Sequence, residues 1–282
     1  MRKFHRAQGA TLILTALLLC GAGCWAGTAT AEELRLGGTG AGLANVQSLA
    51  EAFAASRPGL GVKFVPSLGS SGGIKALLAG VLDVSVSARR LKDEECAKGA
   101  VAVEYARTPF VFATRSKVVS GFSLSKLVQM YAGDVDEWPD GSPVRLVLRP
   151  TTDSDTQLLR AMSEDMSRAV DRAYARPGFI EVQTDQDNAD ALESVSGSIG
   201  TATLGQIIAE NRSLRVLAVD GVEPRAAAAA AGRYPFLKVL FLVVRSDASP
   251  LVAQFVAYAQ SPEARAILTR HEYWVHDQHS AR

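Results

Sequence analysis

The sequence predicts an α/β fold built around parallel sheet. Three observations support this prediction. Apolar residues alternate between strand-like and helix-like spacing over residues 33–87, and a second alternation of the same kind follows residue 117. Turns rich in Gly, Ser and Thr separate the predicted strands from the predicted helices. This order is typical of the strand–helix–strand units of a parallel sheet.

The first half of the chain contains two consecutive strand–helix–strand units. Strands are predicted at residues 34–36, 62–65 and 84–86. Between them, residues 43–53 and 74–81 carry apolar side chains at helical spacing. Two such units imply a parallel sheet with right-handed crossovers.

The second half begins with a helix whose two ends can be recognised. Ser123 is suited to cap its start, and Gly133 is suited to end it. Residues 225–231 form either a helix or a surface loop of small side chains. The other elements predicted here are strands at residues 144–148, 198–201, 214–219 and 238–244, a helix with its buried stripe at residues 158–162, and a closing helical segment over residues 251–268.

Residues 1–31 have the pattern of a secretory signal peptide. Three basic residues precede an apolar stretch centred on residues 12–19, and no further charged residue comes before Glu32. The stretch is too diluted by Gly and Thr for a membrane anchor, and small residues favour cleavage near Ala31. A lipoprotein anchor through Cys20 or Cys24 is the less favoured alternative. The sequence therefore predicts an exported protein.

The charge of the exported chain excludes several classes of partner. Removal of residues 1–31 leaves 27 Lys and Arg against 29 Asp and Glu, a net charge of −2. Nothing in this balance favours binding to nucleic acid or to an anionic membrane surface. The spacing of His271, His276 and His279 matches no strong metal-binding pattern, and no metal or cofactor is predicted.

Three polar loops between strands and helices indicate an anion site. They are GGTGAG (residues 37–42), SLGSSGG (residues 67–73) and RPTTDSDT (residues 149–156). Loops of this kind gather at the carboxyl ends of parallel strands, where helix N-termini offer unpaired N–H groups. Arg149 adds a full positive charge and a planar donor fork. Arg89 and Arg90 are either a solvated pair or a second source of charge for the crevice.

A serine hydrolase is the strongest enzymatic alternative. The segment Gly69-Ser70-Ser71-Gly72-Gly73 satisfies the G-x-S-x-G elbow pattern, and His271 or His276 follows it late in the chain. However, three residues separate this segment from its strand, and no HGGG-type oxyanion motif precedes it. We therefore do not predict an enzyme, and assign no catalytic residue.

Three segments carry a resemblance to a known family. They are LGSSGGIKALLAGVLDVSVSARRLKDEE (residues 68–95), LVQMYAGDVDEWPDG (residues 127–141) and the loop from Arg149 to Thr156. They are similar to segments of the periplasmic phosphate-binding protein family of ABC transporters, within the type II periplasmic-binding fold. The similarity is collinear over most of residues 34–275.

This resemblance implies two lobes, each a mostly parallel sheet flanked by helices. Residues 32–110 plus 240–282 would form the first lobe, and residues 111–239 the second. The lobes would close around a small inorganic oxyanion. The protein would be a periplasmic monomer that delivers this anion to an ABC permease in the inner membrane.

The resemblance also implies a set of ligand-binding residues. They are Thr39, Gly40 and Ala41 in the first loop, Ser70, Ser71 and Gly72 in the second, Ser87 after the third strand, and Arg149, Ser154 and Thr156 in the third loop.

Two departures from the family pattern leave the anion open. Ala88 stands where the family has a carboxylate that accepts the proton of phosphate, and the third loop is one residue longer. Without a carboxylate the site favours proton-free oxyanions such as sulfate, tungstate or molybdate. Asp153 or Asp155 in the longer loop is a candidate replacement, so phosphate stays the first expectation.

Overall fold

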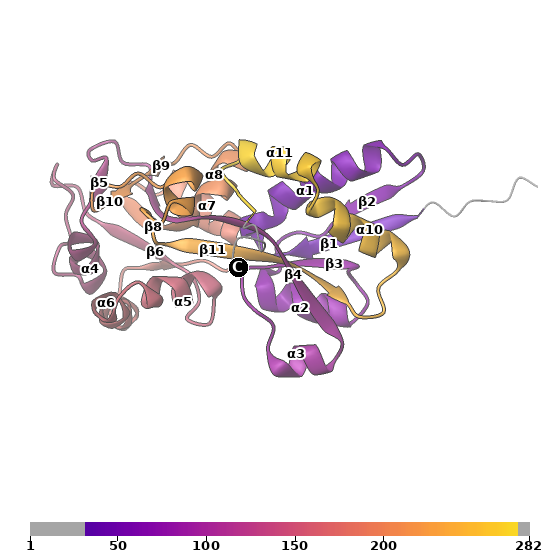
Figure 1. Cartoon of the computed structure of the whole chain (residues 1–282). Coiled ribbons are helices and arrows are strands. Elements are labelled where there is room, and N and C mark those ends of the chain that lie inside the picture. The colour runs from indigo at the N-terminus through magenta and orange to yellow at the C-terminus, as the bar shows by residue number, and fades with distance from the viewer. Residues whose placement is uncertain (1–31, 276–282) are drawn as a thin grey trace, which may run out of the picture. The chain divides into compact units, whose positions relative to one another are not determined.

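The structure is a computed structural model and describes residues 32–275 (Figure 1). The strands of this part of the chain are β1 (Glu33–Gly38), β2 (Gly61–Phe64), β3 (Val84–Ser87), β4 (Ala100–Thr114), β5 (Gly121–Phe122), β6 (Arg145–Leu148), β7 (Ile180–Glu181), β8 (Ser198–Thr203), β9 (Arg215–Val216), β10 (Ala218–Val219) and β11 (Leu237–Arg245). The helices are α1 (Gly40–Ala55), α2 (Gly69–Leu78), α3 (Asp93–Ala97), α4 (Leu124–Ala132), α5 (Ser154–Ala161), α6 (Glu164–Ala175), α7 (Asp185–Ser194), α8 (Leu204–Ala209), α9 (Ala226–Ala230), α10 (Pro250–Ala259) and α11 (Pro262–Arg270).

One sheet runs through these residues in the order β2-β1-β3-β11-β4-β8-β6-β7. Its two ends are parallel, because β1 pairs in parallel with β2 and β3, and β6 pairs in parallel with β7 and β8. The middle is antiparallel. There β11 pairs with β3 and β4, and β4 pairs with β8.

The long strands β4 and β11 connect the two parallel parts (Figure 1). Residues 237–245 of β11 pair with residues 100–109 of β4, with an irregularity between Leu240 and Phe241. Beyond this stretch, β4 pairs with β8. The strands β11 and β4 therefore link β3 to β8 within the one sheet.

The core lies on both faces of each parallel part, as the alternation of side chains along a strand requires. In β11, Leu240 and Leu242 pack against α1, α10 and α11, whereas Phe241 and Val243 pack toward α2. In β4, Phe110 and Phe112 face the cluster of α4, α5, α6 and α9, and the intervening Val111 faces α7 and α8.

The structure confirms most of the predicted elements. Ser123 caps α4 by accepting a hydrogen bond from Lys126 N, and Gly133 ends that helix in the left-handed region with φ of 81°. Two predictions need correction. Residues 214–219 form two two-residue strands, β9 and β10, and the closing segment consists of two helices, α10 and α11.

Some predictions lie outside the described residues. The signal peptide, its cleavage near Ala31, and His276 and His279 belong to this group. Across residues 32–275, no helix combines the length and apolar character that a membrane crossing requires. In the same range, no cluster of His, Cys, Asp and Glu is arranged to hold a metal ion.

Candidate anion-binding site

The three predicted loops form the starts of α1, α2 and α5, and glycine brings the first two together. A Cβ on Gly73 would lie 2.6 Å from the Cα of Gly38, and a Cβ on Gly38 would collide with the backbone of Val86. The carbonyl of Gly38 also accepts a hydrogen bond of 2.9 Å from Leu68 N. Only glycine at these positions permits this close approach.

The donors of the first loop are already engaged by the protein itself. Thr39 is 2% exposed, and its hydroxyl donates a hydrogen bond of 3.0 Å to Asp185, the first residue of α7. The backbone of Ala41 is hydrogen-bonded to the same carboxylate. The N–H of Gly40 donates to Ser67 Oγ at 3.0 Å. A side-chain carboxylate therefore occupies the position predicted for a ligand at this helix start.

The third loop is held by an ion pair within it. Arg149 is 3% exposed, and its Nη2 donates to Asp153 Oδ2 at 2.9 Å. The other carboxylate oxygen of Asp153 accepts from Asp155 N at 2.9 Å and so caps α5. Thr156 donates its hydroxyl hydrogen to the carbonyl of Arg149 at 3.1 Å. Burial lowers the pKa of Arg149, but Asp185, Asp153 and Asp155 outweigh burial and raise it above its ordinary value.

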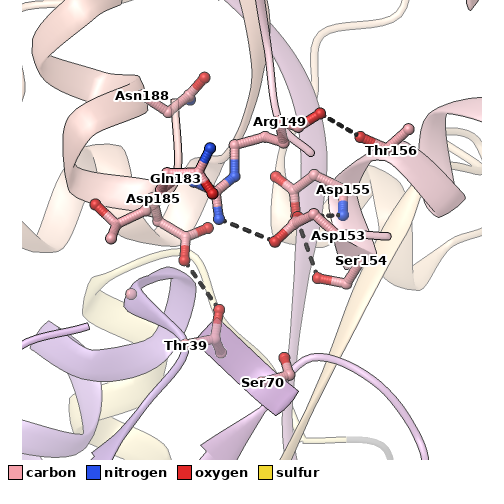
Figure 2. A network of polar contacts seen from close by, with 12 residues as sticks. Thr39, Ser70, Arg149, Asp153, Ser154, Asp155, Thr156, Gln183, Asp185 and Asn188 are labelled. Carbon is pink, nitrogen blue, oxygen red and sulfur yellow. Dashed lines mark hydrogen bonds and ion pairs between the residues drawn. The ribbon is translucent and has the colours of Figure 1, made fainter. Parts of the chain in front are cut away.

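Lys238 of β11 adds a second buried cation behind the loop. It is fully buried, contacts Asp155 Oδ1 and lies 3.9 Å from Asp185 Oδ1. We call Arg149, Asp153, Asp155, Asp185 and Lys238 the buried ion cluster. Figure 2 shows its arginine and carboxylates converging, with Asp185 pointing across to Thr39.

The pKa values of Asp155 and Asp185 are shifted in opposite directions. Burial raises the pKa of Asp155 to about 6, although Lys238 acts in the opposite direction. Burial also acts to raise the pKa of Asp185, but Lys238, Arg149 and the hydroxyl of Thr39 outweigh it and hold the pKa below its ordinary value. Asp155 therefore takes up a proton at a higher pH than Asp185 does.

The second loop keeps donors available. Ser70 is 8% exposed, and its oxygen accepts a hydrogen bond of 2.9 Å from Ala88 N, which leaves its hydrogen to donate. Ser71 Oγ accepts from Arg89 Nε at 3.3 Å and Nη2 at 3.1 Å. Ser87 is different, because its hydroxyl is bonded within its own turn, to the backbone of Arg89.

A cavity of about 190 Å³ lies between the second and third loops. Its lining includes four of the predicted ligand-binding positions: Ser70, Ser71, Gly72 and Ser154. The other lining residues are Leu68, Gly69, Arg89, Pro150, Thr152, Asp153 and Gln183. The remaining predicted positions are absent from this lining: Thr39, Gly40, Ala41, Ser87, Arg149 and Thr156. The three loops are thus neighbours, but only two of them face this cavity.

The arrangement around Ser70 and Ser71 does not favour the hydrolase alternative. The recorded partners of the two hydroxyls are Ala88 N and the guanidinium of Arg89, and a guanidinium cannot act as a general base. Within residues 32–275, no recorded hydrogen bond joins either serine to His271.

Two residues of the buried ion cluster were not predicted from the sequence. Lys238 is the first residue of the predicted strand at residues 238–244, and a charged residue at the terminus of a strand is not unusual. Asp185 follows Thr184, which forms a capping box with Asp187. That Thr-x-x-Asp pattern is a sequence signal for a further helix start, and it identifies the position of Asp185.

Comparisons with known proteins agree with this architecture. A family model described as a PBP superfamily domain matches residues 26–263. A comparison with curated protein sequences finds no match.

Solved structures share the fold at low sequence identity. A Clostridium perfringens protein assigned as a phosphate ABC transporter substrate-binding protein, with bound phosphate, is 18% identical with a TM-score of 0.74, covering 87% of this chain and 100% of that one. An ABC-type phosphate transport receptor from Vibrio cholerae is 17% identical with a TM-score of 0.61, covering 86% and 100%. The periplasmic molybdate-binding protein of Azotobacter vinelandii is 18% identical with a TM-score of 0.61, covering 86% and 100%.

These likenesses confirm the predicted two-lobed α/β fold. The family model spans most of the chain, from before β1 to the start of α11. The chain therefore belongs to the PBP superfamily domain family.

Proposed function

We propose that the protein is an extracytoplasmic solute-binding protein that binds phosphate or a similar tetrahedral oxyanion in the cavity between the second and third loops. The observation that carries this proposal is the cavity itself. It is lined by the start of α2, by hydroxyls of Ser70, Ser71 and Ser154, and by the guanidinium of Arg89. Helix N-termini, hydroxyls and guanidinium groups are the donors that suit oxyanions.

The residues that line the cavity also influence which oxyanion it would bind. Ala88 offers no carboxylate to accept a proton from the ligand, which favours fully ionised anions. Asp153 lines the cavity, whereas Asp155 is buried against Lys238 and is absent from the lining. Asp153 is therefore the better candidate to accept the proton of phosphate, and phosphate precedes sulfate, molybdate and tungstate in this proposal.

The wider role follows from the family and from the solved structures that share the fold. Those structures include phosphate and molybdate receptors of transport systems. We propose that residues 32–110 plus 240–282 and residues 111–239 act as the two lobes, that an ABC permease receives the anion, and that the protein works in the periplasm without catalysing a reaction. Closure of two lobes on a ligand is a known hinge motion.

A calorimetric titration of the exported chain tests this proposal. Phosphate, sulfate, molybdate and tungstate would each be titrated at pH 5, 7 and 8.5, with chloride as the control anion. We expect saturable one-to-one binding of at least one tetrahedral oxyanion. Failure of all four to bind at millimolar concentration would refute the proposed function.

A further inference from the structure

We propose that Arg89 supplies the positive charge of the anion site, and that it presents the edge formed by Nε and Nη2 to the ligand. This inference rests on the proposed function and identifies the residue that selects for charge. Arg89 contacts Glu95 and Ser71, and it lines the cavity.

Glu95 of α3 fixes the guanidinium from one side. Arg89 Nη1 donates to Glu95 Oε2 at 2.8 Å, and Nη2 donates to Oε1 at 2.7 Å. Hydrogen bonds from Arg89 lower the pKa of Glu95 to about 2, so the pair is ionised at any working pH. The side chains are 22% and 13% exposed, respectively. A bidentate pair of this kind fixes both the position and the plane of the guanidinium.

The other edge of the guanidinium is held only by a neutral hydroxyl. Nε and Nη2 both donate to Ser71 Oγ, at 3.3 Å and 3.1 Å. These contacts are longer than those to Glu95 and join a cation to an uncharged acceptor. Hydrogen bonds between ionised groups are shorter and about twice as strong as neutral ones. An oxyanion at this edge would therefore displace the oxygen of Ser71, whose own hydroxyl can then donate to the anion.

Arg89 is the only Lys or Arg among the residues that line this cavity. Arg149, by contrast, is 3% exposed and faces the carboxylates of Asp153, Asp155 and Asp185. Its charge is already balanced inside the protein. Arg89 is also paired with a carboxylate, that of Glu95, but it lines the cavity, and its Nε and Nη2 both donate to the hydroxyl of Ser71 there. The positive charge on the cavity wall therefore comes from Arg89, and residue 88, an alanine, adds no carboxylate.

The test uses two variants that break the same ion pair and have opposite effects on the charge of the cavity. Arg89→Gln removes the cation, and Glu95→Gln removes its counter-charge while retaining Arg89. Both break the Arg89–Glu95 ion pair, so thermal unfolding should reveal a loss of stability in each. Arg90→Gln is the matched control, because Arg90 is exposed and is absent from the cavity lining.

Titration calorimetry with the oxyanion that the exported wild-type chain binds best gives the readout. We expect Arg89→Gln to weaken binding by about 10- to 100-fold, the range for loss of a charge-assisted hydrogen bond. Glu95→Gln should weaken binding less than Arg89→Gln does, because Arg89 keeps its charge but loses the ion pair that fixes it. Arg90→Gln should stay within about twofold of wild type, because it leaves both Arg89 and Glu95 in place.

Two results would overturn the inference while leaving the proposed function intact. One is an affinity of Arg89→Gln equal to that of Arg90→Gln. The other is an equal loss of affinity in Arg89→Gln and Glu95→Gln, which would assign the pair a purely structural role. Absence of any oxyanion binding by the wild-type chain would instead refute the proposed function, and this inference with it.

Discussion

Removal of the buried cation Lys238 should destabilise the fold in a manner that depends on pH. Lys238 is fully buried, contacts Asp155, and lies 3.9 Å from Asp185 Oδ1. The substitution Lys238→Met keeps most of the volume but leaves these carboxylates without that counter-charge. Breaking one side of a buried ion pair costs about 3–5 kcal/mol. We expect a loss of this size in the free energy of unfolding at pH 8.

The loss should shrink as the pH falls. Burial raises the pKa of Asp155 above its unfolded value of 3.8, to about 6 with Lys238 present. Above the unfolded value, the folded state binds more protons than the unfolded state, so stability decreases as pH rises through this window. Lys238 lowers the pKa of Asp155, so without Lys238 this pKa rises above 6 and the pH range in which stability decreases extends upward with it. Between pH 8 and pH 6 the variant should therefore regain up to about 1.4 kcal/mol per pH unit relative to wild type.

Guanidinium denaturation followed by tryptophan fluorescence measures both effects, at pH 5, 6 and 8. Lys63→Met is the matched control, because Lys63 is exposed on β2, and it should change stability by less than about 0.5 kcal/mol. The double variant Lys238→Met with Asp155→Leu should recover most of the stability, since an apolar pair can replace a buried ion pair. A pH-independent loss, or a double variant as unstable as Lys238→Met alone, would refute this reasoning.

Three further predictions concern the site. Asp153→Asn, which keeps a capping residue at α5, should weaken phosphate binding by about tenfold relative to sulfate in calorimetric titrations, if Asp153 accepts the proton of phosphate as proposed above; equal losses for both anions would contradict that role. Asp185→Asn should cost roughly 1.5–3 kcal/mol at pH 7 in denaturant unfolding, because it weakens the bond from Thr39. The difference from wild type should begin to shrink as the pH falls below 3.8, because the folded state holds the pKa of Asp185 below that value, and a difference that does not shrink at all there would show another origin. A fluorophosphonate probe should leave Ser71 unmodified, because its recorded partner is a guanidinium and not a base, and labelling seen by mass spectrometry would revive the hydrolase alternative.

Local patterns in the sequence predicted the elements that depend on neighbouring residues. The cap at Ser123 and the left-handed Gly133 bound α4 as expected. The first two strand–helix–strand units are present, with β1 in parallel between β2 and β3. These features arise from capping, periodicity and turn chemistry, which act over a few residues and are visible in one segment at a time.

The long strand β4 was not predicted because its sequence disguises it. It contains Pro109 and the charged residues Glu104 and Arg107, and proline usually indicates the edge or end of a strand. In the structure, Phe110 N donates a hydrogen bond to Phe236 O. The antiparallel pairing with β11 includes Pro109, which lies opposite Leu237, and continues to Ala100. Pairing between segments more than 100 residues apart decides this strand, and local propensity does not reveal it.

The buried ion cluster was missed for the same reason. The contact between Lys238 and Asp155 spans 83 residues, and that between Thr39 and Asp185 spans 146. The sequence reveals the charge of Arg149, which we predict to bind the ligand, but not the carboxylates that surround it. The sequence was enough to predict that the loops lie near one another. Which charged side chains pair with carboxylates of the protein, and which line the cavity, could be seen only in the folded chain.

A crystal structure of the exported chain grown with tungstate would test the central claim most directly, because tungsten gives an anomalous signal that locates the anion. We expect one strong peak in the cavity between α2 and α5, within hydrogen-bonding distance of Ser70, Ser71 and Arg89. A peak bound instead by Thr39 and Arg149, with Asp185 displaced, would contradict the site described above. Absence of any peak, together with absence of binding in solution, would contradict oxyanion binding itself.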